Sequence, residues 1–192
     1  MKPKNLVTSF LFGLVFGLLP YCGSCQQSFC KPMNLLDTLQ RKVGCWTENI
    51  GNSRYEFLIC QYSNGAKNGA FQVFFKDSAV AVEGTYCDGQ IVGKYIEYNE
   101  HDRSLLKAIK HYSDMEKLNG KYEYYHSNGR LKFYTYYVDD RRHGEYCEFY
   151  ETGELWKKGQ MKDDYKDGVW IFYGRSGEIE DSMTFERGKQ LR

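Results

Sequence analysis

Two pairs of adjacent aspartates are the residues in this sequence that could most directly support chemistry. Asp139-Asp140 and Asp163-Asp164 each place two carboxylates side by side, and paired carboxylates bind calcium or carry out acid–base catalysis. The pairs stand 24 residues apart, and each begins five residues before a glycine. A catalytic pair would usually be a single departure from such a period. We therefore predict a turn at each pair and no enzymatic activity.

The four histidines do not form a metal-ligand motif. His126 and His143 lie in segments rich in turn residues and are predicted to be solvated. His101 and His111 are ten residues apart, which matches no standard zinc-ligand spacing. No serine has the context of a nucleophile elbow, and no glycine-rich phosphate loop precedes a helix. The sequence thus predicts no metal, no cofactor and no catalytic residue.

The cysteines bear on the cellular compartment rather than on catalysis. Seven occur, at positions 22, 25, 30, 45, 60, 87 and 147. Some of them could pair in an exported protein, because oxidising compartments let disulfides persist. Their connectivity does not follow from their spacing. Cys45 and Cys60 fall within one expected hairpin and are the pair that we favour.

The N-terminus has the pattern of a secretory signal, which we place at residues 1–24. Basic Lys2 and Lys4 precede an apolar stretch at 6–19, and the small residues Gly23-Ser24 follow. Basic, apolar and small regions in this order are typical of a signal peptide. The apolar stretch is short for a membrane-spanning helix, which needs about 20 residues. Export is favoured over an uncleaved anchor.

The residue after this segment is a lipidation candidate. Cys25 directly follows Gly23-Ser24 and resembles the lipidated cysteine of bacterial lipoproteins, although Cys22 stands where that motif usually has Leu or Val. Lipidation of Cys25 and ordinary cleavage beside it both remain open. In either case we expect an exported protein, periplasmic or at the outer membrane or cell surface.

The charge balance excludes some partners. Without the signal the chain carries 24 basic and 25 acidic residues, so its bulk charge gives no reason to bind nucleic acid or an anionic membrane. We predict a protein partner, no nucleic acid, and membrane association only through a lipid on Cys25. The sequence does not indicate the oligomeric state.

A glycine followed by an aromatic residue two positions later recurs through the rest of the chain. The pairs are Gly44/Trp46, Gly69/Phe71, Gly93/Tyr95, Gly120/Tyr122, Gly144/Tyr146 and Gly168/Trp170, at spacings of 25, 24, 27, 24 and 24 residues. We call these six the register glycines. A second aromatic follows five residues after each glycine except the first, as Phe74, Tyr98, Tyr125, Phe149 and Tyr173. Such self-similarity indicates a repeat architecture, with units beginning near residues 44, 69, 93, 120, 144 and 168 over 44–192.

One unit can be followed from residue 120 to residue 143. Residues 121–125 are rich in tyrosine and predict a strand. Residues 127–130 contain an Asn-Gly turn, whose two residues tolerate the positive φ of a tight hairpin. A second strand is predicted at 131–138, followed by a polar connection. The unit beginning at Gly93 is three residues longer, which predicts a longer hairpin loop around 101–107.

Three segments carry a family resemblance. They are Gly-Lys-Tyr-Glu-Tyr-Tyr at 120–125 with Ser-Asn-Gly-Arg-Leu-Lys at 127–132, Gly-Glu-Tyr-Cys-Glu-Phe-Tyr at 144–150 with Glu-Thr-Gly-Glu-Leu at 151–155, and Gly-Val-Trp-Ile-Phe-Tyr at 168–173. These segments resemble the variant MORN repeat of many bacterial proteins. The match is looser over 65–119, and over 44–64 Asn49 replaces the second aromatic. The resemblance implies an all-β fold, an elongated single-layer antiparallel sheet of successive hairpins, and a scaffold or binding role.

The segment before the first unit predicts a short helix. Asn34 can cap a helix over 34–43, Asp37 stands at the favourable third position, and Leu35, Leu36, Leu39 and Val43 share a face. Residues 25–43 would then form a linker and a helix that covers the exposed edge of the first hairpin.

The strand pattern leaves one surface as the candidate binding site. Side chains alternate along a strand, so the aromatics two and five residues after each register glycine point to opposite faces. Either Lys and Glu side chains cover one face, or an exposed tyrosine-rich face binds a partner. The candidate residues are Tyr98, Tyr125, Phe149 and Tyr173. The favoured function is a non-catalytic scaffold for protein binding at the cell envelope. An antitoxin-like or immunity-like protein is the alternative, and an envelope glycan hydrolase comes third.

Overall fold

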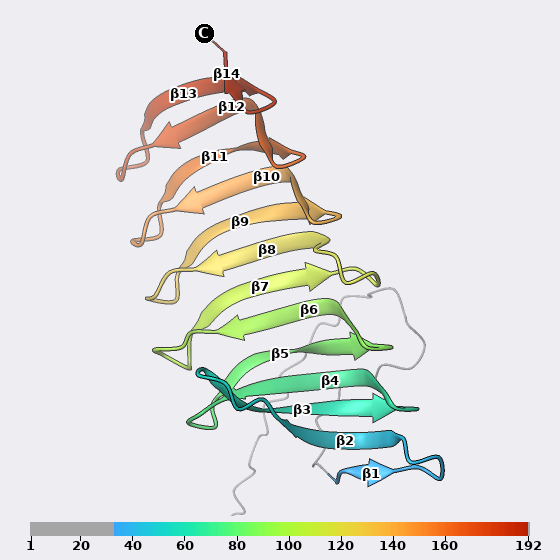
Figure 1. Cartoon of the computed structure of the whole chain (residues 1–192). Helices are drawn as coiled ribbons and strands as arrows, with labels where there is room; N and C mark the ends of the chain where they lie inside the picture. Colours follow the sequence, from blue (N-terminus) through green and yellow to red (C-terminus); the bar gives the residue numbers. More distant parts are fainter. Residues whose placement is uncertain (1–32, 192) are drawn as a thin grey trace, which may run out of the picture.

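The computed structural model describes residues 33–191, which form a single antiparallel sheet. Fourteen strands follow one another in chain order and stack like the rungs of a ladder (Figure 1). The strands are β1 (Leu35–Leu36), β2 (Lys42–Asn49), β3 (Tyr55–Ser63), β4 (Ala66–Phe75), β5 (Val80–Cys87), β6 (Gln90–Tyr98), β7 (Leu106–Tyr112), β8 (Gly120–Tyr125), β9 (Leu131–Val138), β10 (Arg141–Phe149), β11 (Leu155–Lys162), β12 (Tyr165–Tyr173), β13 (Ile179–Glu186) and β14 (Lys189–Gln190). Among these residues there is no helix long and apolar enough to cross a membrane.

Each register glycine lies in an even-numbered strand, β2 to β12, and has a positive φ, between 67° and 116°. Residues with a Cβ adopt this conformation only at a cost, which explains why the sequence repeats a glycine there. The residue paired with each glycine on the following strand is large, in chain order Tyr62, Tyr86, Tyr112, Tyr137, Met161 and Phe185. The sequence therefore repeats because each unit pairs a glycine on one strand with a large apolar or aromatic residue on the next.

Two kinds of tight turn join the strands. Between units both central residues have positive φ, as in Asp139 (48°) and Asp140 (68°), which is the geometry that suits the twist of a hairpin. The prediction of turns at the aspartate pairs is thus confirmed. Within a unit the turn at 127–130 differs from the prediction, because only Gly129 has positive φ, at 82°. Its N–H donates to the carbonyl of His126 at 3.0 Å.

The aspartate turns also fasten each unit to the preceding one. The N–H of Asp164 donates to the carbonyl of Arg142 at 3.0 Å, and Oδ1 of Asp164 accepts the N–H of Arg142 at 3.0 Å. Asp140 exchanges the same two bonds with Leu118, at 3.0 and 2.8 Å. The recurring aspartates therefore have a structural role that accounts for their period.

The helix predicted over 34–43 is wrong, because this segment forms β1, a turn and the start of β2. Leu35–Leu36 pair with the first residues of β2. Oδ1 of Asp37 accepts the N–H groups of Leu39 and Arg41, each at 2.9 Å, and so closes a turn. Asn and Asp favour turns as readily as helix starts, and a helix this short is marginal without a packed apolar face. The leucines of the expected face are instead exposed.

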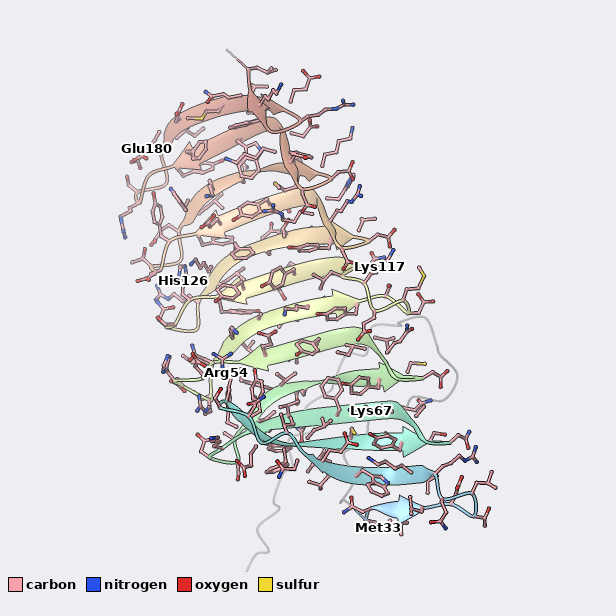
Figure 2. All side chains as sticks on the ribbon, viewed as in Figure 1. Met33, Arg54, Lys67, Lys117, His126 and Glu180 are labelled. Atoms are coloured by element: carbon pink, nitrogen blue, oxygen red, sulfur yellow. The ribbon has the colours of Figure 1, made fainter. Side chains whose placement is uncertain are left out.

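The core lies largely on one face, which we call the ring face. It carries the ring that follows each register glycine by two residues, namely Trp46, Phe71, Tyr95, Tyr122, Tyr146 and Trp170. Phe71 and Trp170, which are 2% and 1% exposed, lie over Gly84 and Gly159 of neighbouring strands. A single-layer sheet thus buries rings by placing them over glycines. We call the other side of the sheet the opposite face. Figure 2 shows the side chains along the whole sheet.

Candidate functional site

The four candidate binding residues form a row on the opposite face, one each on β6, β8, β10 and β12. All four are half-buried. The hydroxyl of Tyr98 donates to Glu83 at 2.9 Å, and burial together with this carboxylate raises the pKa of Tyr98 to about 12. Burial also raises the pKa of Tyr125, while the ring of Tyr173 lies 5.8 Å from the ammonium of Lys158. The row is integrated into the sheet and is only partly open to a partner.

Two tyrosines on β9, Tyr134 and the exposed Tyr136, extend this row. The ring centroid of Tyr134 lies 6.3 Å from that of Phe149 and 6.3 Å from that of Tyr136, which is 38% exposed. We call Tyr134, Tyr136 and Phe149 the opposite-face patch. The sequence pattern did not single out Tyr134 or Tyr136, since they fall between the repeating aromatics. Alternation from Phe133 on the ring face would have placed both on the opposite face.

On the ring face the rings form an unbroken series from β8 to β13. Ring centroids lie 5.6 Å apart for Tyr122 and Phe133, 5.8 Å for Phe133 and Tyr146, and 5.4 Å for Tyr146 and Trp170. Phe185 continues the series, 6.4 Å from Trp170. Aromatic pairs at such distances stabilise the sheet beyond their burial. This series is mainly the structural core of the last three units.

Three glutamates interrupt the ring face, each four residues after a register glycine. Glu48 receives the ammonium groups of Lys42 at 2.5 Å and Lys67 at 3.2 Å, and the hydroxyl of Tyr62 at 2.5 Å. Burial opposes ionisation of Glu48, but these hydrogen bonds outweigh it and lower its pKa to about 2. The site is an ionised carboxylate that two lysines share among rings.

The other two glutamates, Glu97 and Glu148, repeat this arrangement. Lys107 and Lys110 bind Glu97 at 3.2 and 2.5 Å, and Lys157 binds Glu148 at 2.8 Å. Burial again opposes ionisation of Glu97, and the hydrogen bond and charge of Lys110 outweigh it, so its pKa is lowered. Carboxylates held ionised in this way are poor proton donors at neutral pH.

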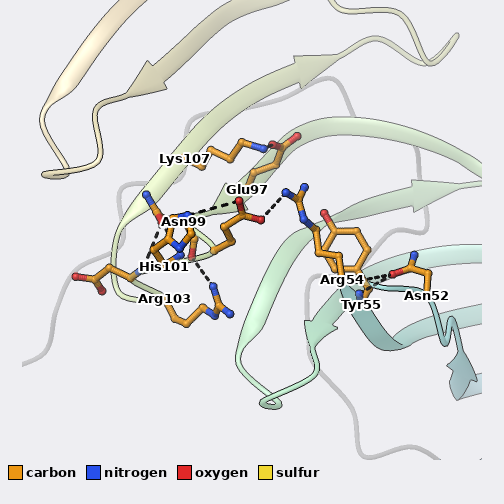
Figure 3. A network of polar contacts seen from close by, with 10 residues as sticks. Asn52, Arg54, Tyr55, Glu97, Asn99, His101, Arg103 and Lys107 are labelled. Atoms are coloured by element: carbon orange, nitrogen blue, oxygen red, sulfur yellow. Dashed lines mark hydrogen bonds and ion pairs between the residues drawn. The ribbon is translucent and has the colours of Figure 1, made fainter.

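Two hairpin connections meet over one hollow (Figure 3). Residues 50–54 join β2 to β3, and residues 99–105 join β6 to β7. The guanidinium of Arg54 pairs with the carboxylate of Glu100 across the two connections. On the second connection Oδ1 of Asn99 accepts the N–H of His101 at 2.8 Å. No repeating feature of the sequence indicated that these two connections would be neighbours.

The longer loop predicted around 101–107 is present as residues 99–105, and it lies back on the preceding unit. The guanidinium of Arg103 lies 3.8 Å from the ring centroid of Phe75, and its Nε is 3.2 Å from a carboxylate oxygen of Asp77. The hollow beneath has a volume of about 150 Å³, and Tyr55, Glu97 and Tyr124 are among its lining residues. Its carboxylates are already paired with cations, so its geometry suits binding better than proton transfer.

Two of the four histidines, His111 and His126, bind backbone carbonyls. His126 was expected to be solvated, but it is half-buried and its Nε2 lies 3.0 Å from the carbonyl oxygen of Phe149 in the next unit. A carbonyl only accepts, so Nε2 carries the proton. Nδ1 of His111 is bound to the carbonyl of Lys121 at 2.8 Å. Within residues 33–191 no group of three His, Cys, Asp or Glu side chains could hold a metal ion.

The disulfide favoured from the sequence, Cys45 with Cys60, is wrong. Cys45 is disulfide-bonded, whereas Cys60 is a free, buried thiol. The register explains why: Cys45 pairs with Gln61 and Cys60 with Trp46, so the two side chains point to opposite faces. Cysteines whose Cβ atoms point apart cannot bridge without moving the backbone. The lipidation candidate Cys25 lies outside the described residues.

Comparison with known proteins finds a family model that matches two of the repeats. The model of the MORN repeat variant matches residues 118–139 and 142–163, which are two adjacent units of the ladder. A search of curated proteins found no match. The matched segments cover β8 to β11 almost completely, and the neighbouring units share their register glycine. Repeats of this type are commonly non-catalytic modules for binding proteins or membranes.

Proposed function

Since two units of this chain are MORN repeats of the variant type, we propose that the protein is a non-catalytic scaffold that holds another protein. The observation that carries this proposal is the opposite-face patch, an aromatic surface with no second layer of structure over it among residues 33–191. Tyrosines dominate the energetics of protein interfaces, because one end is apolar and the other can form hydrogen bonds. The row of Tyr98, Tyr125, Phe149 and Tyr173 would extend the contact along the ladder.

The recurrence of polar residues supports binding over catalysis. Asp140 and Asp164 are engaged in the turns between units, and Glu48, Glu97 and Glu148 are paired with lysines. These residues have structural roles, whereas the exposed part of the aromatic surface, including Tyr136, remains accessible to a partner.

We also propose that the protein acts at the cell envelope after export, on the evidence of the basic, apolar and small regions at 1–24. The intact mass of the mature protein tests this directly. A mass that matches cleavage before Cys25 with added acyl chains indicates a lipoprotein, and the bare mass from a nearby residue indicates a soluble exported form. A chain that retains residues 1–24 contradicts export by cleavage.

The binding role is tested with purified protein and an envelope extract from the source cells. We expect a stoichiometric complex that Tyr136→Ala weakens at least about fivefold, since truncation of an interface hot-spot tyrosine costs more than about 1 kcal/mol. Tyr165→Ala is the matched control, because Tyr165 is 59% exposed but lies at the start of β12, away from the patch. Equal affinity of both variants would exclude the patch as the interface.

The identity of the partner separates the two binding roles. A secreted toxin in the complex would select an immunity role, and an envelope component would select a scaffold. Turnover of an envelope glycan by the pure protein, lost on changing one acidic residue, would overturn the non-catalytic proposal.

A further inference from the structure

We infer that the ring face of the last two units binds a ligand with a single carboxylate beside an apolar group. The site is a hollow of about 240 Å³ on β10, β11 and β12, lined by Arg142, Tyr146, Lys157, Met161, Asp164, Lys166 and Trp170. We call it the lysine hollow. It lies on the other side of the sheet from the opposite-face patch, so it does not depend on the proposed protein interface.

The lining carries one cation without a counter-ion. Nε of Arg142 lies 3.2 Å from Oδ1 of Asp164, and Nζ of Lys157 lies 2.8 Å from a carboxylate oxygen of Glu148. Lys166 has no carboxylate within 4.0 Å in the part of the chain that the structure describes. With two of the three cations paired, the hollow has an excess of one positive charge.

The first two units show a carboxylate contact that the equivalent lysines make. Lys42 and Lys67 stand, like Lys166, two residues before a register glycine, and both pair with Glu48. Phe172 occupies the corresponding glutamate position in the last unit. Asp181, which pairs with Phe172 across the strands, does not reach Lys166 within 4.0 Å.

The glutamate of the preceding unit does not supply the missing charge either. Glu148 stands opposite Lys157, whereas Glu48 stands opposite Leu58. Lys157, which stands where the first unit has Leu58, therefore pairs with Glu148, and Lys166 is left without a carboxylate partner. Phe172, like Val73 and Tyr124 at the same position of two other units, supplies no carboxylate to Lys166.

The surroundings of Lys166 specify the rest of the ligand. Its ammonium lies 4.6 Å from the ring centroid of Trp170 and 4.7 Å from that of Phe185. Rings stabilise a cation but carry no net charge, and burial together with Lys157 lowers the pKa of Lys166. A partly desolvated ammonium gains from an anion of one charge, and the rings of Tyr146 and Trp170 offer an apolar wall beside it.

The test uses the fluorescence of Trp170 in a protein in which Trp46 and Trp156 are replaced by phenylalanine. The probe is N-acetylphenylalanine, and its control is N-acetylphenylalanine amide, which differs only in lacking the carboxylate. We expect saturable binding of the acid at pH 7 and at least about tenfold weaker binding of the amide. Equal responses to the two compounds would overturn the proposal.

Two variants test the residues. Lys166→Met keeps the length of the side chain over the rings, and Phe172→Glu places a carboxylate at the position that Glu48, Glu97 and Glu148 occupy in three other units. Both should weaken binding of the acid at least about tenfold. Lys42→Met is the matched control and should leave binding unchanged. Unchanged binding in Lys166→Met and Phe172→Glu, with folding verified by circular dichroism, refutes the site.

Two further probes distinguish the source of the carboxylate. Phenylacetate represents a small acid, and a pentapeptide ending in phenylalanine represents the terminus of a polypeptide. Tighter binding of the peptide than of phenylacetate indicates a chain terminus, and the reverse indicates a small molecule. Failure of both, together with the acetylated amino acid, excludes a carboxylate ligand without affecting the proposed protein interface.

Discussion

Adding one methyl group at Gly159 is expected to disrupt the core of the last two units. A Cβ built there would lie 2.4 Å from Cδ2 and 2.5 Å from Cε2 of Trp170. Carbon atoms in contact normally lie about 3.5–4.0 Å apart, so the overlap exceeds about 1 Å. The indole has little room to retreat, because it is 1% exposed, packs 5.4 Å from the ring of Tyr146, and donates its Nε1–H to the carbonyl of Gln160 at 3.2 Å.

The magnitude follows from two contributions. Overpacking a well-ordered core costs about 1–3 kcal/mol, and displacement of the indole breaks a hydrogen bond worth about 1 kcal/mol. We therefore expect Gly159→Ala to lower the free energy of unfolding by about 3 kcal/mol. Urea titration followed by tryptophan fluorescence and by circular dichroism measures this change.

Gly174→Ala is the matched control. Gly174 also lacks a positive φ, and the atoms nearest to its added Cβ belong to the carboxylate ends of Glu178 and Glu180, which are exposed and can swing away. We expect a change within about 0.5 kcal/mol. If Gly159→Ala also falls within that range, the rings are not packed tightly over the glycines. Trp170→Phe in the Gly159→Ala background should recover part of the loss, because the smaller ring makes room for the methyl group.

Three further changes test the interior and the charges of the ring face. Thr135→Val should raise the free energy of unfolding by about 1 kcal/mol, because Oγ1 of this fully buried residue has no hydrogen-bond partner; a loss measured in urea would show that the hydroxyl is satisfied. Glu48 has a pKa of about 2 in the fold against an ordinary 4.5, so its stabilisation is present above pH 4.5 and is lost as the pH falls toward 2. Glu48→Gln should therefore remove up to about 3 kcal/mol at pH 7 and much less at pH 2.5, and an equal loss at both pH values would contradict the ion pair. Burial raises the pKa of the Cys60 thiol, so iodoacetamide should modify Cys60 only in urea, and rapid labelling of the folded protein would show that β3 opens.

The sequence was sufficient to predict the regular part of the fold. The register glycines and their aromatics predicted a ladder of hairpins, because a positive φ and a ring packed on small residues are local requirements that each unit must meet. The aspartate pairs predicted turns for the same reason. A sequence period therefore predicts the local structure that every unit shares, and this prediction does not require the contacts between units.

Contacts between units were not predictable in this way. Asp37 closes a turn in its own hairpin and does not begin a helix, because the side chains that favour helix starts also favour turns. The predicted disulfide between Cys45 and Cys60 was wrong because the strand register sets the face of each side chain. The observed register differs by one residue from the register that would place both cysteines on the same face. The role of His126 depends on a carbonyl 23 residues further along the chain.

The irregular positions deserve the greater weight in assigning function. A repeat unit that replaces a structural residue loses a contact, and the loss persists only where the neighbouring units allow it. Lys157 stands where the first unit has Leu58, and it pairs with Glu148, whereas Leu58 leaves Glu48 available to Lys67. Lys166 therefore has no carboxylate within 4.0 Å in the part of the chain that the structure describes, and this is the position from which we infer a ligand.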